Sequence, residues 1–310
     1  MSDTASAGDK LIPAPPAKKK TGFIVGAIIA VVVIVAAILI VINLGGNKET
    51  VRLGVVGASD SQWKIFIEEA AKEGIDVEVV DFQEYTQPNP AVSEGEIDLN
   101  MFQHIIYLAQ YNVDSDDDLT IIGSSAIYPL GLYSTKYDDV KDIPEGGVVS
   151  VPDDPSNQAR ALLVLQAADV ISLKNGGSPF STLADVETDK SRVTVKALGA
   201  AFTATSLPDV DAAIINNDYV EDAGLTADDV IFQDDPEDES ALPYINIFVT
   251  RAEDKDNETY RKLVDIYQTS QPVLDAVQKN AGGTAVFVQT PVDQLNKSLA
   301  QTEKDYAASK

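Results

Sequence analysis

Cysteine is absent from this chain, and histidine occurs once, at position 104. Without cysteine there is no disulfide, no thiolate nucleophile and no Cys-ligated metal, and a lipid-modified cysteine cannot anchor the chain to a membrane. A single imidazole excludes a multi-histidine metal site and any Ser-His-Asp triad built away from His104. The Walker A, GxGxxG and HExxH motifs are also missing. We therefore expect no enzyme activity, no cofactor and no metal.

Basic residues are scarce as well. The chain has 23 Lys and Arg against 49 Asp and Glu, which gives a net charge of −26. So acidic a surface repels nucleic acid and anionic lipid headgroups, and we expect no nucleic-acid partner. Two acidic loops, residues 114–118 and 233–240, are predicted to be solvated surface, because neither has the ligand spacing of a hand-type calcium loop.

One long apolar run lies near the N-terminus. Phe23 to Ile42 contains 20 residues without a charge, and a helix of about 20 residues spans the roughly 30 Å of a bilayer core. Lys18–Lys20 precede the run, and such residues favour the cytoplasmic side. We predict a disordered cytoplasmic tail, a transmembrane signal anchor and a linker to an extracellular domain: residues 1–20, 21–44 and 45–50. A cleaved signal peptide is the alternative, but its apolar core is usually only about 7–15 residues long.

Strand-like and helix-like segments alternate from Val51 onward. VRLGVVGAS and IDVEVVDF read as strands, and SQWKIFIEEAAKEG between them has apolar residues at helical spacing and a glycine stop. Further helices are predicted over residues 158–171 and 258–281. This alternation is typical of an α/β fold with mainly parallel sheets. Ligands of such folds lie beyond the carboxyl ends of strands.

Aromatic residues around the single histidine are the first candidate for a binding site. Phe102, His104 and Tyr107 lie within six residues of one another. Together they could form a pocket wall that suits a thioether, because sulfur packs favourably against ring edges. The alternative is that the two rings are core residues and the histidine is structural.

Two polar groups are further candidates. Asp154 suits a helix N-cap and Pro155 the first helical position, and Arg160 nearby could bind a carboxylate with two hydrogen bonds. A capped helix with a surface arginine fits equally well. Asn216 and Asn246 lie in or after apolar stretches, where a buried amide must be hydrogen-bonded. They could bind an amino acid or hold turn backbone.

Several stretches between Val51 and about Asp293 match the pattern of one family. They are VRLGVVGASDSQW, DFQEYTQPNPAVSEGEIDLNMFQH, YPLGLYS, VSVPDDPSNQARALLVLQAADVISLK, DVDAAIINNDYVEDAGL and PYINIFVTR. The most specific are QPNPAVSEGEIDLNMFQH and VPDDPSNQARALLVLQ. On these residues the chain resembles the methionine-binding lipoprotein (NlpA) family, which are substrate-binding proteins of methionine ABC importers.

The resemblance implies a fold and a function. The fold would be an α/β, two-lobed, periplasmic-binding-protein-like domain (type II, the Venus flytrap). Lobe 1 would comprise residues 51–132 and 246–310, and lobe 2 residues 133–245. The function would be to capture L-methionine or a related small amino acid and deliver it to an ABC permease with separate ATPase subunits.

The resemblance also implies which residues surround the ligand. The methionine side chain would be enclosed by Tyr85, Phe102, His104 and Tyr107. Arg160 would bind the carboxylate. The polar end would be completed by Asn157, Asn216 and Asn246.

The chain also departs from the family's pattern. The lipid-anchor cysteine is missing, and the predicted transmembrane helix would replace it. Ser61-Gln62-Trp63 stands where many members have Pro-His, and NNDY follows DAAII in place of commoner small residues. D-methionine, a methionine-containing dipeptide and another small amino acid therefore remain alternative ligands. A ligand-binding sensor or adhesin ectodomain remains an alternative function.

Overall fold

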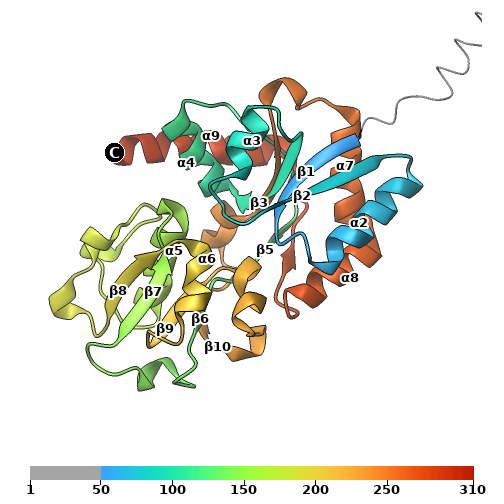
Figure 1. The fold of residues 1–310 in the computed structure, drawn as a ribbon. Coiled ribbons are helices and arrows are strands. Elements are labelled where there is room, and N and C mark those ends of the chain that lie inside the picture. Colours follow the sequence, from blue (N-terminus) through green and yellow to red (C-terminus); the bar gives the residue numbers. More distant parts are fainter. Residues whose placement is uncertain (1–49) are drawn as a thin grey trace, which may run out of the picture. The chain divides into compact units, whose positions relative to one another are not determined.

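The computed structural model describes residues 50–310, which contain two five-stranded sheets (Figure 1). The first sheet has the strand order β2-β1-β3-β11-β4. Its strands are β1 (Thr50–Val56), β2 (Asp76–Phe82), β3 (Leu99–His104), β4 (Thr120–Ser124) and β11 (Asn246–Thr250). β1 runs parallel to β2 and β3, whereas β11 runs antiparallel to β3 and β4.

Helices cover both faces of the first sheet (Figure 1). One face carries α2 (Ser61–Lys72), α7 (Glu258–Thr269) and α8 (Gln271–Asn280), and the other carries α3 (Pro88–Ser93), α4 (Ile105–Ser115) and α9 (Val292–Ser309). The buried rings of Phe66 and Phe248 pack edge-on against Tyr267, with centroids 5.7 and 5.2 Å away. This aromatic cluster joins α2, β11 and α7 in one core.

The second sheet has the order β10-β6-β9-β7-β8. Its strands are β6 (Gly131–Tyr133), β7 (Val148–Pro152), β8 (Thr194–Leu198), β9 (Ala212–Ile215) and β10 (Val230–Gln233). β7 is parallel to β8 and β9, while β6 is antiparallel to β9 and β10. The helix α5 (Pro155–Ala167) follows β7 and packs Leu162 and Leu165 into the core of this half, and the short helix α6 (Ala200–Thr203) follows β8.

The chain passes between the two sheets twice. It leaves the first sheet through β5 (Ala126–Ile127), which pairs with β12 (Val286–Phe287), and it returns between β10 and β11. Rings from both halves meet in one buried cluster, because Tyr85 follows β2, Phe102 lies in β3 and Tyr219 follows β9. The carboxyl ends of strands from both sheets therefore face the same space, where ligands of open α/β sheets bind.

One predicted helix is broken into two. The helix predicted over residues 258–281 is α7 followed by α8, with Ser270 between them in an extended conformation (φ −73°, ψ 109°). Pro272 explains the break, because a proline inside a helix lacks an N–H donor and its ring clashes with the carbonyl four residues earlier. The same proline is well placed in the first turn of α8.

Both sheets are mixed, so the prediction of mainly parallel sheets was wrong. Alternating strands and helices indicated parallel pairing, but β6 and β11 enter their sheets directly from the other half of the molecule and run antiparallel to their neighbours. The helix predicted over residues 158–171 ends earlier, at Ala167, while its start at Pro155 agrees with the predicted cap at Asp154 and first helical position at Pro155. Asp169 just beyond it has a φ of 57°, a left-handed conformation typical of helix ends.

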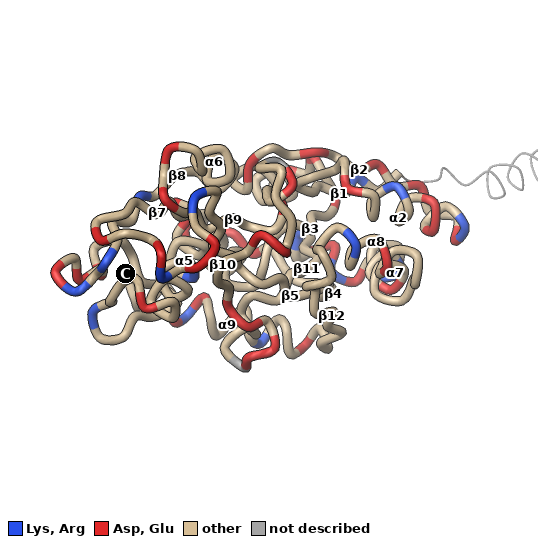
Figure 2. Tube along the Cα trace, turned by 90° about the horizontal axis from the view of Figure 1, so that it is seen from below, with Lys and Arg blue, Asp and Glu red and all other residues tan. Residues whose placement is uncertain are grey.

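Acidic residues are distributed over the surface of the described part of the chain. Figure 2 shows Asp and Glu on elements around both sheets, and Lys and Arg at fewer, scattered positions. In this view no basic stripe of the kind that tracks a phosphate backbone runs along residues 50–310.

The predicted N-terminal segments fall outside this region. The cytoplasmic tail (1–20), the anchor (21–44) and nearly all of the linker (45–50) precede the described residues. Within residues 50–310, no helix combines the length and the apolar character that a bilayer crossing requires.

Candidate functional site

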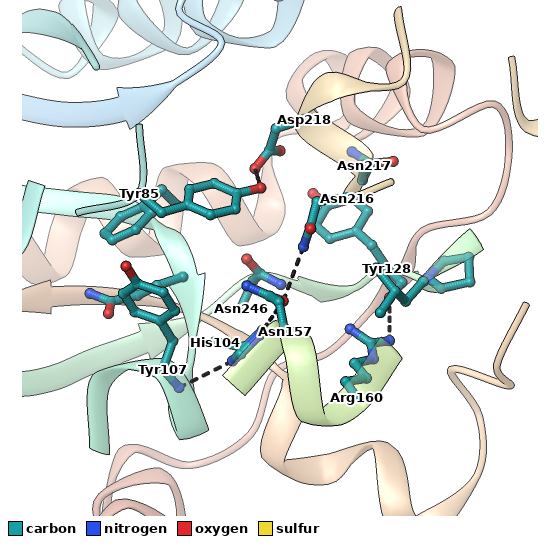
Figure 3. A pocket seen from close by; sticks show the side chains of 14 residues that line it. Tyr85, His104, Tyr107, Tyr128, Asn157, Arg160, Asn216, Asn217, Asp218 and Asn246 are labelled. Atoms are coloured by element: carbon teal, nitrogen blue, oxygen red, sulfur yellow. Dashed lines mark hydrogen bonds between the residues drawn. The ribbon is translucent and has the colours of Figure 1, made fainter. Parts of the chain in front are cut away.

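A cavity lies between the two sheets, at the carboxyl ends of β3, β7 and β9 (Figure 3). It holds about 450 Å³ of space, part of it open to solvent. All eight predicted site residues line it: Tyr85, Phe102, His104, Tyr107, Asn157, Arg160, Asn216 and Asn246. The fold thus brings together side chains that are far apart in the sequence.

Aromatic rings form one side of the cavity. Ring centroids are 5.8 Å apart for Tyr85 and Phe102, 6.2 Å for Tyr85 and Tyr107, and 5.7 Å for Phe102 and Tyr107. Tyr219 adds a ring from the other half, 5.3 Å from Tyr85. These spacings are those of favourable aromatic pairs. The rings are therefore both packed against one another and available as a wall for an apolar, polarisable side chain.

His104 ends β3 and caps α4. Its Nδ1 accepts a hydrogen bond from the backbone N–H of Tyr107 (3.2 Å), so the proton of the neutral ring is on Nε2. Nε2–H then donates to Oδ1 of Asn157 (3.2 Å). Burial first, and the positive charge of Arg160 second, lower the pKa of His104 to about 3. The ring is neutral near pH 7 with both nitrogens engaged, so it is not a free general base.

A chain of hydrogen bonds fixes the amides at the start of α5. Asp154 caps this helix, as predicted, by accepting from the N–H of Asn157 (2.9 Å), and its oxygens also accept from Asn157 Nδ2 (2.9 and 3.1 Å). These two bonds identify the nitrogen of the Asn157 amide, because only a nitrogen can donate to the carboxylate. The other amide atom is therefore Oδ1, which accepts a hydrogen bond from Nδ2 of Asn216 (3.0 Å). The other end of the Asn216 amide, Oδ1, is buried and has no hydrogen-bond partner among residues 50–310. An unused acceptor therefore remains at the cavity.

Arg160 is held in place by its neighbours. Its Nε and Nη2 donate to the carboxylate of Asp234 (2.7 and 3.1 Å), and Nη2 also donates to the carbonyl oxygen of Tyr128 (2.8 Å). The guanidinium lies 4.3 Å from the ring centroid of Tyr244, a cation–π distance. The described residues provide no hydrogen bond to Nη1. That N–H group is the one a ligand carboxylate could reach.

The prediction that the acidic loop 233–240 is solvated surface was wrong at Asp234. This residue pairs with Arg160, and its Oδ1 also accepts from the backbone N–H of Leu130 (2.7 Å). The physical reason is tertiary: the two partners are 74 positions apart, and a local composition pattern cannot reveal such a pair.

Asn246 is positioned by the first sheet. It begins β11 and lies opposite His104 of β3 in the register of the two strands. Its backbone oxygen accepts a hydrogen bond from the N–H of Ser125 (2.8 Å), and its side chain lines the cavity. The strand pairing therefore aligns an amide with the imidazole.

Residues beyond the predicted eight also contribute. Tyr128 and Asp218 line the cavity, and Tyr244 packs under Arg160. Asp218 accepts a hydrogen bond from the hydroxyl of Tyr85 (2.7 Å), and desolvation is the main cause that raises its pKa to about 7. The unusual NNDY sequence pointed to Asp218, and the two tyrosines lie in the family-matching stretches YPLGLYS and PYINIFVTR, although no ligand role was predicted for them.

The comparisons with known proteins agree with this architecture. The family model described as NlpA lipoprotein matches residues 51–288. The chain belongs to the NlpA lipoprotein family. A D-methionine-binding lipoprotein of Yersinia pestis is 38% identical over 241 residues, which cover 76% of this chain and 87% of the relative. The corresponding lipoprotein of Escherichia coli (strain K12) is 37% identical over the same shares of both chains.

Solved structures of similar proteins share the two-lobed α/β fold. A nutrient-binding protein from Burkholderia cenocepacia bound to methionine is 36% identical, with a TM-score of 0.71 over 76% of this chain and 99% of that one. The substrate-binding protein of a methionine transporter from Streptococcus pneumoniae is 31% identical, with a TM-score of 0.71 over 77% of this chain and 95% of that one. This NlpA family member therefore has a fold used for substrate binding in transport.

Proposed function

We propose that the chain is an extracytoplasmic receptor that binds methionine in the cavity between its sheets and delivers it to an ABC importer. One observation carries the proposal: a wall of aromatic rings and a polar group with an available arginine N–H meet in the same cavity. A free amino acid with an apolar side chain needs both. The names of the family's methionine-binding members favour methionine over other amino acids.

The aromatic side would hold the thioether. Tyr85, Phe102 and Tyr107 present ring edges and faces at pairwise spacings near 6 Å, and sulfur–aromatic contacts contribute roughly 0.3–1.5 kcal/mol each. His104 completes this wall as a neutral ring that keeps the amide of Asn157 in position. An apolar side chain of similar length is the alternative occupant.

The polar side would hold the backbone groups of the amino acid. Arg160 offers Nη1 to the carboxylate, and a hydrogen bond to a charged group is about twice as strong as one between neutral groups. Asn246 and Asn157 line the same cavity. The pairing of Arg160 with Asp234 fixes the guanidinium before ligand arrives, which reduces the entropy lost on binding.

Transport would require separate proteins. Binding would draw the two lobes together, with lobe 1 formed by residues 51–132 and 246–310 and lobe 2 by residues 133–245. The closed receptor would then dock on a permease whose ATPase subunits are in the cytoplasm. A sensor or adhesin ectodomain would bind the same ligand without this step.

The direct test is calorimetric titration of ligand-stripped protein with L-methionine and then with the other amino acids. We expect Arg160→Ala to weaken L-methionine binding about 30-fold or more, since losing one partner of a charged hydrogen-bonded pair costs about 2–5 kcal/mol. Arg261→Ala is the matched control, because Arg261 lies on α7 with its side chain 55% exposed. Binding of another amino acid alone would replace the substrate, and no binding of any amino acid would contradict the receptor role.

The N-terminal segment 21–44 is proposed to anchor this receptor in the cell membrane as a single transmembrane helix, with residues 1–20 in the cytoplasm. The support is the length and apolarity of the run and the lysines before it. The chain has no cysteine of its own, so single introduced cysteines can be labelled without background. A membrane-impermeant maleimide should label Ser309→Cys in intact cells and leave Ser6→Cys unlabelled until the cells are lysed. Labelling of both in intact cells would contradict this topology.

A further inference from the structure

The cavity is lined by two side chains of opposite charge. Arg160 is one and Asp218 is the other, while the remaining lining residues are aromatic, amide or apolar and His104 is neutral. An amino acid zwitterion also carries one charge of each sign. The role proposed above accounts for the arginine, whereas the carboxylate of Asp218 has no role yet.

Asp218 lines the same cavity as the unused acceptor. Figure 3 shows both side chains at the cavity, and Oδ1 of Asn216 is buried with no partner among residues 50–310. The hydroxyl of Tyr85 donates to Oδ2 of Asp218 (2.7 Å), and the side chain of Asn217 also forms a hydrogen bond with this carboxylate, which can accept about four. The cavity therefore offers a carboxylate and a free amide oxygen, which is the chemistry that an ammonium group requires.

The electrostatic surroundings of Asp218 also favour a cation. Asp218 keeps some exposed surface toward the cavity, yet desolvation raises its pKa, and the charged side chain that adds to the shift is another carboxylate, Asp60. Within the described residues no Lys or Arg forms an ion pair with Asp218. Hydrogen bonds with Tyr85 and Asn217 stabilise the carboxylate, but no positive charge does so until a cation enters the cavity.

We propose that Asp218, with Oδ1 of Asn216, binds the α-ammonium group of the ligand and thereby selects amino acids whose amino group is free. This inference rests on the proposed function and adds a selection rule to it. N-acylated methionine lacks this ammonium, and a peptide with methionine after the first position carries its ammonium on another residue, so both are excluded. Among the alternatives left by the sequence, free amino acids are favoured over such peptides.

A competing explanation is that Asp218 only holds the two halves together through Tyr85. One variant tested with two ligands separates these roles. Asp218→Asn keeps an oxygen that can accept from the Tyr85 hydroxyl but removes the charge. Tyr111→Phe is the control, because it removes a hydroxyl that donates to Asp117 outside this cavity. If Asp218 contacts the ammonium, its substitution changes the ratio of the affinities for ligands with and without that group. If Asp218 only joins the two halves, its substitution lowers both affinities by the same factor.

The experiment is calorimetric titration of the full-length chain in detergent, stripped of ligand by unfolding and refolding, with L-methionine and with 4-(methylthio)butanoate, its analogue without the amino group. In the wild type L-methionine should bind much more tightly. Asp218→Asn should reduce the ratio of the two Kd values about 10- to 100-fold, and Tyr111→Phe should leave the ratio unchanged. An unchanged ratio in Asp218→Asn overturns this inference alone. Failure of the wild type to bind any free amino acid overturns the proposed function and this inference together.

A second measurement needs no variant. Because the pKa of Asp218 is raised to about 7, binding of an ammonium should ionise it and release a proton, so affinity for L-methionine should rise up to about tenfold from pH 6 to pH 8. The other titratable groups that interact with Asp218 are Asp60 and four tyrosines, at positions 85, 128, 219 and 267. Burial raises the pKa values of these tyrosines well above this pH range. An affinity for L-methionine that falls from pH 6 to pH 8 would overturn the proposal.

Discussion

At the scale of single residues, His104 is the only histidine of the chain and gives isolated imidazole signals in NMR spectra. Its pKa is lowered to about 3, so we expect the Nε2–H tautomer to persist without titration from pH 8 to pH 5 in long-range ¹H–¹⁵N spectra. The unfolded chain binds a proton below about pH 6.5 and the folded ring does not. His104 therefore lowers the free energy of unfolding as the pH falls through this range. A titration midpoint near 6.5 in the folded protein would contradict the buried, hydrogen-bonded geometry.

The sequence predicted some residues of the site and missed others for a physical reason. The N-cap at Asp154 followed from its immediate neighbours, because a cap and the N–H group it binds lie within the same helical turn. The partners Asp234 for Arg160 and Asp218 for Tyr85 were not predicted, since each pair is brought together only by the tertiary fold. The ligand roles carried over by resemblance stay predictions until binding is measured.

At the scale of elements, the first turn of α5 affects both the stability of the protein and the geometry of the binding site. Asp154→Ala should reduce the free energy of unfolding by about 1–2 kcal/mol through loss of the cap. It should also weaken L-methionine binding, because the Nδ2 group of Asn157 loses the acceptor that orients this amide. Urea unfolding and calorimetric titration measure the two effects.

The cap of α7 provides the matched control. Asn257 accepts hydrogen bonds from the N–H groups of Thr259 and Tyr260 (2.9 and 3.3 Å), and neither it nor these partners line the cavity. Asn257→Ala should therefore lower stability by a similar amount and leave affinity unchanged. Equal affinities for the two cap variants would show that the orientation of Asn157 does not depend on Asp154.

Element types were easier to predict than their ends and pairings. The strand-helix-strand order from Val51 onward followed from hydrophobic periodicity, because burial imposes period 2 or 3.6 on each segment. The break at Ser270 was missed although Pro272 was visible in the sequence, since apolar periodicity continues through both helices. The antiparallel entry of β11 could not be predicted from its residues, because strand direction depends on how the chain returns from the other sheet.

At the scale of the whole molecule, a tyrosine joins the two halves. The hydroxyl of Tyr85 donates to Asp218, and hydrogen bonds to charged groups contribute about 1.5–3 kcal/mol. Tyr85→Phe should therefore shift the ligand-free protein toward a more open form, seen as a larger radius of gyration in small-angle X-ray scattering. Saturating L-methionine should reduce the difference from wild type.

Tyr111→Phe is the control for this prediction. Tyr111 also donates to a carboxylate, that of Asp117 (3.2 Å), but both residues belong to the end of α4 and the loop after it. Its loss should leave the radius of gyration unchanged. Identical scattering from the two variants would mean that the Tyr85 hydroxyl does not influence how far the halves separate.

The position of β11 also has a consequence for how the protein is made. β3 and β4 do not pair with each other, because β11 lies between them, and β11 ends only at Thr250. A nascent chain that has emerged as far as residue 245 already contains the whole second sheet but cannot complete the first. Until β11 is added, β3 and β4 each have an unpaired edge, and such edges promote aggregation. Completion of the first sheet must therefore wait until most of the chain has been synthesised.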